Sequence, residues 1–160
     1  MKEIRMPPLN QLSPTLVIMA CSATKLEHAA RAIDLYRGVM YSTFRVNVRA
    51  TSAPAVMILS ALHGFIAPDT IIEPYDQLMT PARADLMLGE LDRFMPTAWP
   101  ASARSILLAG GRNYRRVMNA GLARQVELGH IPAGALVLET GGSIGYQRQQ
   151  LGAFLRGERL

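Results

Sequence analysis

The residues best suited to chemistry in this chain lie at the ends of two short apolar segments and in the loops that follow them. They supply a thiol at Cys21, an ammonium group at Lys25, an imidazole at His63 and a carboxylate at Asp76. A carboxylate or an imidazole can take a proton from a nucleophile, and a cation can stabilise a developing negative charge. We therefore expect Asp76 to act as a general base, with Lys25 and His63 holding the substrate or moving a proton.

Each of these residues also has an ordinary structural interpretation. A cysteine at the end of a strand is more often a small buried hydrophobe than a nucleophile. Lys25 could be a solvated surface lysine and His63 a hydrogen-bonded structural histidine. Glu139, also at a strand end, is as well placed as Asp76 for work as a base. These alternatives stay open at this stage.

Two glycine-rich turns each lead from an apolar segment into a segment with helical spacing. The first is Gly110-Gly111, followed by Arg112, and the second runs from Gly141 to Gly145. Free N–H groups at the start of a helix form a natural anion site, and arginine adds charge-assisted bonds. Glycine also serves ordinary tight turns, and neither turn matches a dinucleotide-binding or P-loop pattern.

Other common kinds of site have no support in the sequence. The three histidines are scattered and Cys21 is the only cysteine, so no pattern of metal ligands is present. The nucleophile-elbow pattern G-x-S-x-G is also missing. We expect neither a metal nor another cofactor.

Four apolar runs predict buried strands, because continuous apolar residues are typical of strands covered on both faces. They are Leu16–Cys21, Ala55–Ser60, Ser105–Ala109 and Ala135–Glu139. Amphipathic segments between and after them predict helices near residues 80–95, 113–128 and 146–156. Residues 44–48 fit a strand or a helix, and a parallel crossover favours the helix. The pattern predicts an α/β fold: a three-layer, Rossmann-like parallel sheet of at least four strands, with helices on both faces.

In such a sheet, ligands bind beyond the carboxyl ends of the strands. The loops there contain the expected catalytic residues and a set of expected ligand-binding residues. That second set is Cys21, Ser22, Ser60, Gly64, Tyr75, Gly110, Gly111, Arg112, Tyr114, Gly142 and Gly145. We expect these loops to surround one cavity.

The composition of the chain indicates which class of protein, cellular compartment and binding partners to expect. The chain has 160 residues, of which 49% are hydrophobic and 18% charged, so it can form a substantial core. No apolar run is long enough to cross a membrane, and a lone cysteine fits a cytoplasmic protein. We expect one domain at residues 15–160, preceded by a loosely attached arm at 1–14. The net charge of +5, almost all of it from arginine, favours nucleotide or nucleic-acid partners over membranes.

Several of these segments, taken in order, resemble a bacterial and phage YaaA-like domain family. The matching segments are ACSATK at 20–25, the Leu35-Tyr36 pair, ILSALHGFI at 58–66, EPYDQ at 73–77 and the two later glycine turns. The resemblance implies links to peroxide stress and to DNA binding. It also implies distant similarity to domains of tRNA deazaguanine modification and to the uracil-DNA-glycosylase-like fold.

Two functions follow as expectations. The first is an enzyme that acts on a nucleotide, or on a base within nucleic acid, through N-glycosidic or base-modifying chemistry. In that enzyme Ser22, Lys25 and His63 would hold the base or an oxyanion, and Arg112 or the glycine turns would hold phosphate. The alternative is a non-catalytic module that binds nucleotides or nucleic acid with the same residues.

Overall fold

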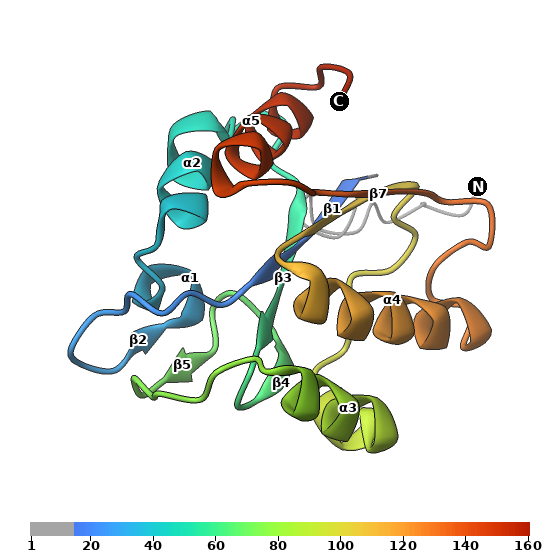
Figure 1. The fold of residues 1–160 in the computed structure, drawn as a ribbon. Coiled ribbons are helices and arrows are strands. Elements are labelled where there is room, and N and C mark those ends of the chain that lie inside the picture. Colours follow the sequence, from blue (N-terminus) through green and yellow to red (C-terminus); the bar gives the residue numbers. More distant parts are fainter. Residues whose placement is uncertain (1–14) are drawn as a thin grey trace, which may run out of the picture.

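The computed structural model describes residues 15–160, which fold around a five-stranded sheet (Figure 1). The arm expected at residues 1–14 lies outside this range. The strand order is β4-β3-β1-β6-β7, and only β4 runs antiparallel to its neighbour. The strands are β1 (Thr15–Ala20), β3 (Ala55–Ser60), β4 (Gly64–Ile66), β6 (Ser105–Ala109) and β7 (Leu136–Glu139). The four predicted parallel strands and the α/β class are confirmed.

Strand β1 occupies the centre of the sheet and is covered on both faces. Leu16 and Ile18 belong to one apolar core, while Val17 and Met19 belong to the other. All four side chains are fully buried. Successive residues of a strand point to opposite faces, so a run of apolar residues with no polar alternation fits only a strand that is buried on both sides.

Five α-helices cover the sheet, and both faces receive some of them (Figure 1). Helices α3 and α4 pack on the face of the first core, and α1, α2 and α5 pack on the face of the second. Their bounds are α1 (Ala32–Leu35), α2 (Val39–Asn47), α3 (Pro81–Gly89), α4 (Arg112–Glu127) and α5 (Ile144–Leu155). A short antiparallel ribbon, β2 (Ala30–Arg31) with β5 (Ile71–Ile72), lies beside α1. Within residues 15–160, no helix combines the length and the hydropathy needed to span a bilayer.

Helix α3 begins as its sequence predicts but ends earlier. Thr80 caps it by accepting a hydrogen bond from the backbone N–H of Arg83, and Pro81 takes the first helical position. The predicted helix to about residue 95 is wrong in its second half. The α-helix stops at Gly89, a poor helix former, and the chain continues as a 3₁₀ turn, η2 (Leu91–Phe94).

The segment that fitted either a strand or a helix is the second half of α2. Phe44 is buried against the second core, whereas Val46 is exposed. The crossover from β1 to the parallel neighbour β3 therefore contains a helix, as the topology requires. The helical prediction for residues 44–48 is confirmed up to Asn47, where the helix ends.

The order of the strands determines where a ligand would bind. The chain passes from β1 to β3 on one side and later returns to β6 on the other side. The crossovers diverge at the carboxyl end of β1, between the loops that follow β1 and β6. This arrangement is the usual binding position in open α/β sheets.

One helix contact depends on a missing side chain. Gly121 lies in the middle of α4, and a Cβ atom there would come within 2.6 Å of the Phe65 ring and 3.1 Å of Trp99. We predict that Gly121→Ala destabilises the protein by about 1–3 kcal/mol through overpacking, although alanine favours helix by about 1 kcal/mol. The matched control is Gly89→Ala in α3, where no atom lies within 4 Å of the added Cβ. Urea unfolding measures both, and equal stability of the two variants would contradict this account of the packing.

Candidate functional site

A thiol lies at the carboxyl end of the central strand. Cys21 follows β1 directly, and its Sγ is 3.1 Å from the hydroxyl oxygen of Tyr114 on α4. The backbone N–H of Ala61, which follows β3, donates to the same sulfur at 3.4 Å. Cys21 therefore links the loops after β1 and β3 to the first turn of α4.

A chain of hydroxyl groups lies beside this thiol. Ser60 Oγ, at the end of β3, is 2.6 Å from Tyr75 Oη, which is 2.6 Å from Tyr36 Oη. Ser60 Oγ also accepts the backbone N–H groups of Leu62 and His63, at 3.2 and 3.0 Å. Because a hydroxyl oxygen has two lone pairs, Ser60 is left to donate its own proton to Tyr75.

Four of the five tyrosines in the chain surround Cys21. Burial raises the pKa of all four phenols, that of Tyr36 to about 12, and the nearby thiol contributes to each rise. The hydroxyls therefore stay protonated at neutral pH. We refer to the following residues as the tyrosine cluster: Cys21, Tyr36, Tyr41, Ser60, Tyr75 and Tyr114.

Lys25 places a positive charge at the edge of the tyrosine cluster. Its Nζ lies 4.5 Å from the centre of the Tyr75 ring and 6.0 Å from that of Tyr36. Its Nζ donates a hydrogen bond to the carbonyl of Ala23 at 3.4 Å. Within residues 15–160, no carboxylate pairs with Lys25, so its charge is available to a ligand.

His63 lies on another side of the same phenol. Its ring meets the Tyr75 ring edge-on, with 5.5 Å between centroids, and its side chain reaches solvent. Desolvation lowers the pKa of His63 below the ordinary value of 6.5. The imidazole is therefore neutral at pH 7 and can accept a proton.

Arg83 of α3 holds the loop that carries His63. Its Nε donates to the carbonyl of Ala61 at 2.8 Å, and an Nη donates to that of Leu62 at 3.1 Å. The planar guanidinium thus fixes two successive carbonyls of the loop after β3.

The structure therefore brings together Lys25, His63, Ser60, Tyr75, Cys21 and Tyr114, all expected from the sequence. Asp76 follows Tyr75 directly, but its side chain is exposed and forms no hydrogen bond or ion pair within the described range. Ser22 closes its own loop, donating to the carbonyl of Thr24 at 2.7 Å and accepting the N–H of Gly38 at 3.2 Å.

The expected glycines and Arg112 occupy several positions around the sheet. Gly110 is buried and donates to Thr140 Oγ1 at 3.0 Å, while Gly111 and Arg112 begin α4 in exposed positions. Gly64 and Gly142 adopt φ angles of 81° and 80°, which serve their turns. Gly145 instead lines a groove between α2 and α5.

Sequence reasoning did not select Tyr36, Tyr41 or Arg83 as site residues. Tyr36 stood within one of the quoted family segments, which was an available signal. Tyr41 donates to the carbonyl of Ala20 at 3.0 Å from inside α2, a contact that only the folded chain creates. The sequence around Arg83 does not indicate that its guanidinium binds two carbonyls that lie 21 and 22 residues away.

The comparisons with known proteins identify a family without naming an activity. Residues 16–141 match the model of the family of unknown function DUF6884. This chain belongs to that family. No curated protein sequence matches this DUF6884 member. Its fold is similar to the crystal structure of AF0587, described as a protein of unknown function, with 15% identity and a TM-score of 0.49. That similarity covers 90% of the present chain and 45% of AF0587, so the chain spans less than half the length of that protein.

The shared phenol of Tyr75 makes a testable contribution to stability. Tyr75→Phe removes both 2.6 Å bonds and leaves Ser60 and Tyr36 without that partner. We predict a loss of about 1–3 kcal/mol in the free energy of unfolding, because buried donors and acceptors then lack partners. Tyr146→Phe is the control, since Tyr146 is 65% exposed. Chemical denaturation that shows equal losses for the two variants would contradict the hydroxyl chain.

The raised pKa of Tyr36 predicts how stability depends on pH. The folded protein retains the Tyr36 proton up to about pH 12, whereas an unfolded tyrosine loses it near pH 10. The stabilisation is therefore complete below pH 10 and is lost between pH 10 and 12, by about 2–3 kcal/mol for this residue. Urea unfolding at intervals from pH 8 to 12 should show a smaller decline for Tyr36→Phe than for the wild type. An equal decline in stability for Tyr36→Phe and the wild type would contradict the assignment of this pH dependence to Tyr36.

Proposed function

We propose that this protein is an enzyme that acts on a nucleotide, or on a nucleobase within nucleic acid. The observation that carries the proposal is the position of Lys25. An ammonium group without a carboxylate partner in the described range lies over the ring of Tyr75, beside a chain of protonated hydroxyls. This combination occurs at the carboxyl edge of the sheet, where α/β proteins bind ligands.

The charge of Lys25 favours an anionic ligand. Its contact with the phenol face is a cation–π interaction, which holds the ammonium in place without neutralising it. A phosphate or a base carbonyl in this position would accept a charge-assisted hydrogen bond.

The hydroxyls of the cluster suit the edge of a nucleobase. At neutral pH the phenols are protonated, and those of Tyr75 and Tyr114, which are only partly buried, can exchange hydrogen bonds with a ring nitrogen, a carbonyl or an exocyclic amine. Ser60 and its two backbone donors hold Tyr75 in one orientation. A fixed set of donors and acceptors of this kind selects a ligand by its hydrogen-bonding pattern.

Hydrolysis of an N-glycosidic bond is a reaction that these groups can support. Water forms a bond to C1′ of the sugar and gives up a proton, while the bond from C1′ to the base nitrogen breaks and the base takes a proton. His63, neutral at pH 7, can accept the proton of the water. Lys25 and the Tyr75 hydroxyl can stabilise the negative charge that develops on the departing base.

His63 is better placed than Asp76 for the role of base. The imidazole contacts Tyr75, whereas the carboxylate of Asp76 makes no hydrogen bond within the described residues. The resemblance of several sequence segments to YaaA-like domains, with their links to nucleic acid, points to the same class of ligand.

A non-catalytic nucleotide-binding module is the second candidate. It is favoured by one observation: within residues 15–160, no carboxylate forms a hydrogen bond or an ion pair with the side chain of Lys25, His63 or Tyr75. Such a module would bind nucleotides with the same residues but would release no free base, as chromatography of incubated nucleosides and oligonucleotides would show.

We predict different effects for substitutions of Lys25 and of His63. Lys25→Met should weaken nucleotide binding about tenfold to a hundredfold, the equivalent of one charge-assisted hydrogen bond. His63→Ala should lower turnover more than affinity, because its proton transfer occurs only as the reaction proceeds. Titration calorimetry with nucleoside monophosphates measures affinity, and chromatographic release of base measures turnover.

Arg104→Gln serves as the control for loss of a positive charge. Arg104 is exposed and directly precedes β6, so it lies at the amino end of the parallel strands, opposite to the end with the tyrosine cluster. It forms no ion pair among the described residues. Melting temperatures of all variants report on folding. If Lys25→Met and Arg104→Gln reduce affinity equally, Lys25 is only a surface charge. If no nucleotide, nucleoside or oligonucleotide binds the wild type, the proposed function is wrong.

A further inference from the structure

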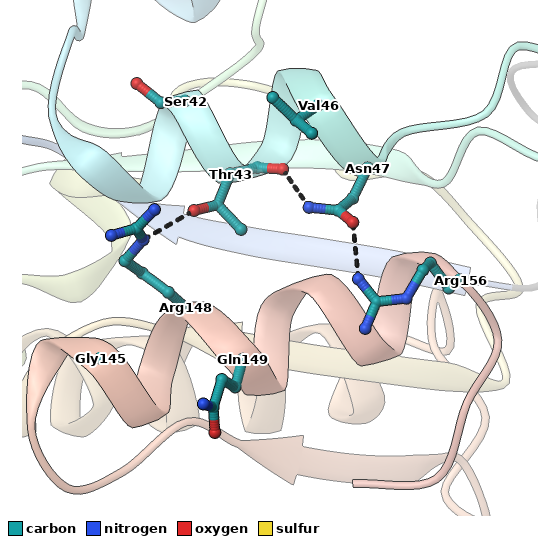
Figure 2. A pocket seen from close by; sticks show the side chains of 8 residues that line it. All are labelled: Ser42, Thr43, Val46, Asn47, Gly145, Arg148, Gln149 and Arg156. Carbon is teal, nitrogen blue, oxygen red and sulfur yellow. Dashed lines mark hydrogen bonds between the residues drawn. The ribbon is translucent and has the colours of Figure 1, made fainter.

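A polar groove of about 520 Å³ runs between α2 and α5, apart from the tyrosine cluster (Figure 2). Hydroxyl, amide and guanidinium groups dominate its lining. Val46 is the one large apolar side chain among the lining residues. The composition is unsuited to an apolar peptide or an acyl chain and suits a charged, hydrogen-bonding ligand.

Arg148 of α5 and Arg156, which directly follows this helix, extend across the groove towards α2 (Figure 2). Arg148 Nε donates to Thr43 Oγ1 at 3.1 Å, and an Nη of Arg156 donates to Asn47 Oδ1 at 2.6 Å. Arg156 also pairs with Glu158, whereas Arg148 has no carboxylate partner within residues 15–160. The bond to Thr43 uses only Nε, so both Nη groups of Arg148 remain available as a fork for an anion.

The positive charge of the protein is concentrated in the segments that form this groove. Residues 36–54 and 141–160 together contain six arginines and one acidic residue, Glu158. Their net charge of +5 equals that of the whole chain, so the remaining residues are neutral on balance. Such an asymmetry is typical of a surface that binds polyanions.

The groove lies next to the tyrosine cluster, on the other side of one helical turn. Tyr41 of α2 faces inward, with its ring 5.3 Å from that of Tyr36. The next residue, Ser42, lines the groove. The first turn of α2 therefore separates the two sites, and a ligand longer than one nucleotide could reach both.

We propose that the groove between α2 and α5 binds the phosphodiester backbone of a single nucleic-acid strand, one nucleotide of which occupies the tyrosine cluster. The inference rests on the proposed function for the occupant of the cluster, and it makes the substrate a polynucleotide. The forked guanidinium of Arg148 can bond one phosphate of the strand with two N–H groups, and Arg156 adds positive charge further along the same groove.

Fluorescence anisotropy with labelled 12-nucleotide single strands of DNA and RNA tests this proposal. At low salt, Arg148→Gln should weaken binding about tenfold, and Arg148→Glu should weaken it further. The slope of log affinity against log salt, measured between 50 and 200 mM NaCl, should fall in magnitude by about 0.7 when one phosphate contact is lost. Arg104→Gln is the matched control and should leave both the affinity and the slope near wild-type values.

Two milder substitutions, Arg148→Lys and Thr43→Val, test the proposal if Arg148→Gln and Arg148→Glu unfold the protein. Arg148→Lys retains the charge and should retain most of the slope, whereas Thr43→Val removes only the bond that orients the guanidinium. Equal losses for the Arg148 and Arg104 variants would overturn the proposal. So would binding of anionic phospholipid vesicles or polyglutamate that competes with the oligonucleotide at equal charge concentration.

The same measurements distinguish failure of the groove proposal from failure of the proposed function on which it rests. If mononucleotides bind in a Lys25-dependent manner but oligonucleotides bind no more tightly, the groove proposal fails and the proposed function stands. If oligonucleotides bind through Arg148 while mononucleotides do not bind, the groove stands as an interface and the nucleotide site at the tyrosine cluster fails.

Discussion

The position of β1 determines how the polar residues at its carboxyl end must be arranged. This strand has a parallel neighbour on each side and helices on both faces, so the loop that follows it begins inside the molecule. A polar group in that position loses water and must find a partner within the protein. Cys21, Ser60 and the surrounding phenols satisfy one another there, and they do so with hydroxyls, a thiol and backbone N–H groups rather than charges. Burial also keeps the phenols protonated, so the groups that satisfy one another form a fixed set of neutral donors and acceptors.

Lysine, histidine and arginine side chains are arranged around this neutral interior. Lys25 lies at its edge over Tyr75, His63 lies on another side of the same ring, and Arg148 lies beyond the first turn of α2. A neutral recognition surface flanked by cations suits a ligand with an uncharged, hydrogen-bonding part and an anionic part. A nucleotide has that division between its base and its phosphate. Arg83 contributes by a different route, because it fixes the carbonyls of the loop that carries His63.

The sequence predicted those features that depend on local patterns. Ala55–Ser60 and Ser105–Ala109 match β3 and β6, because a strand buried on both faces is apolar throughout. Strand β4 was missed because it has three residues, and its only reason to be a strand is the antiparallel pairing with β3.

Residues after strand ends were expected to share one cavity. The structure joins Lys25, His63, Ser60 and Tyr75, but Gly145 lines the α2–α5 groove instead. Helix α2 separates the two regions, and no pattern in the loop sequences reveals that it lies between them. The contacts of Tyr41 and Arg83 likewise depend on packing between distant segments.

A crystal structure of the protein with a bound nucleoside monophosphate would test the central claim most directly. The account predicts the base against the hydroxyl of Tyr75 at the carboxyl edge of the sheet. It also predicts an oxygen of the ligand within hydrogen-bonding distance of Lys25 Nζ, in place of the bond to the Ala23 carbonyl. A nucleotide bound elsewhere, with the tyrosine cluster unchanged and Lys25 facing solvent, would contradict the account.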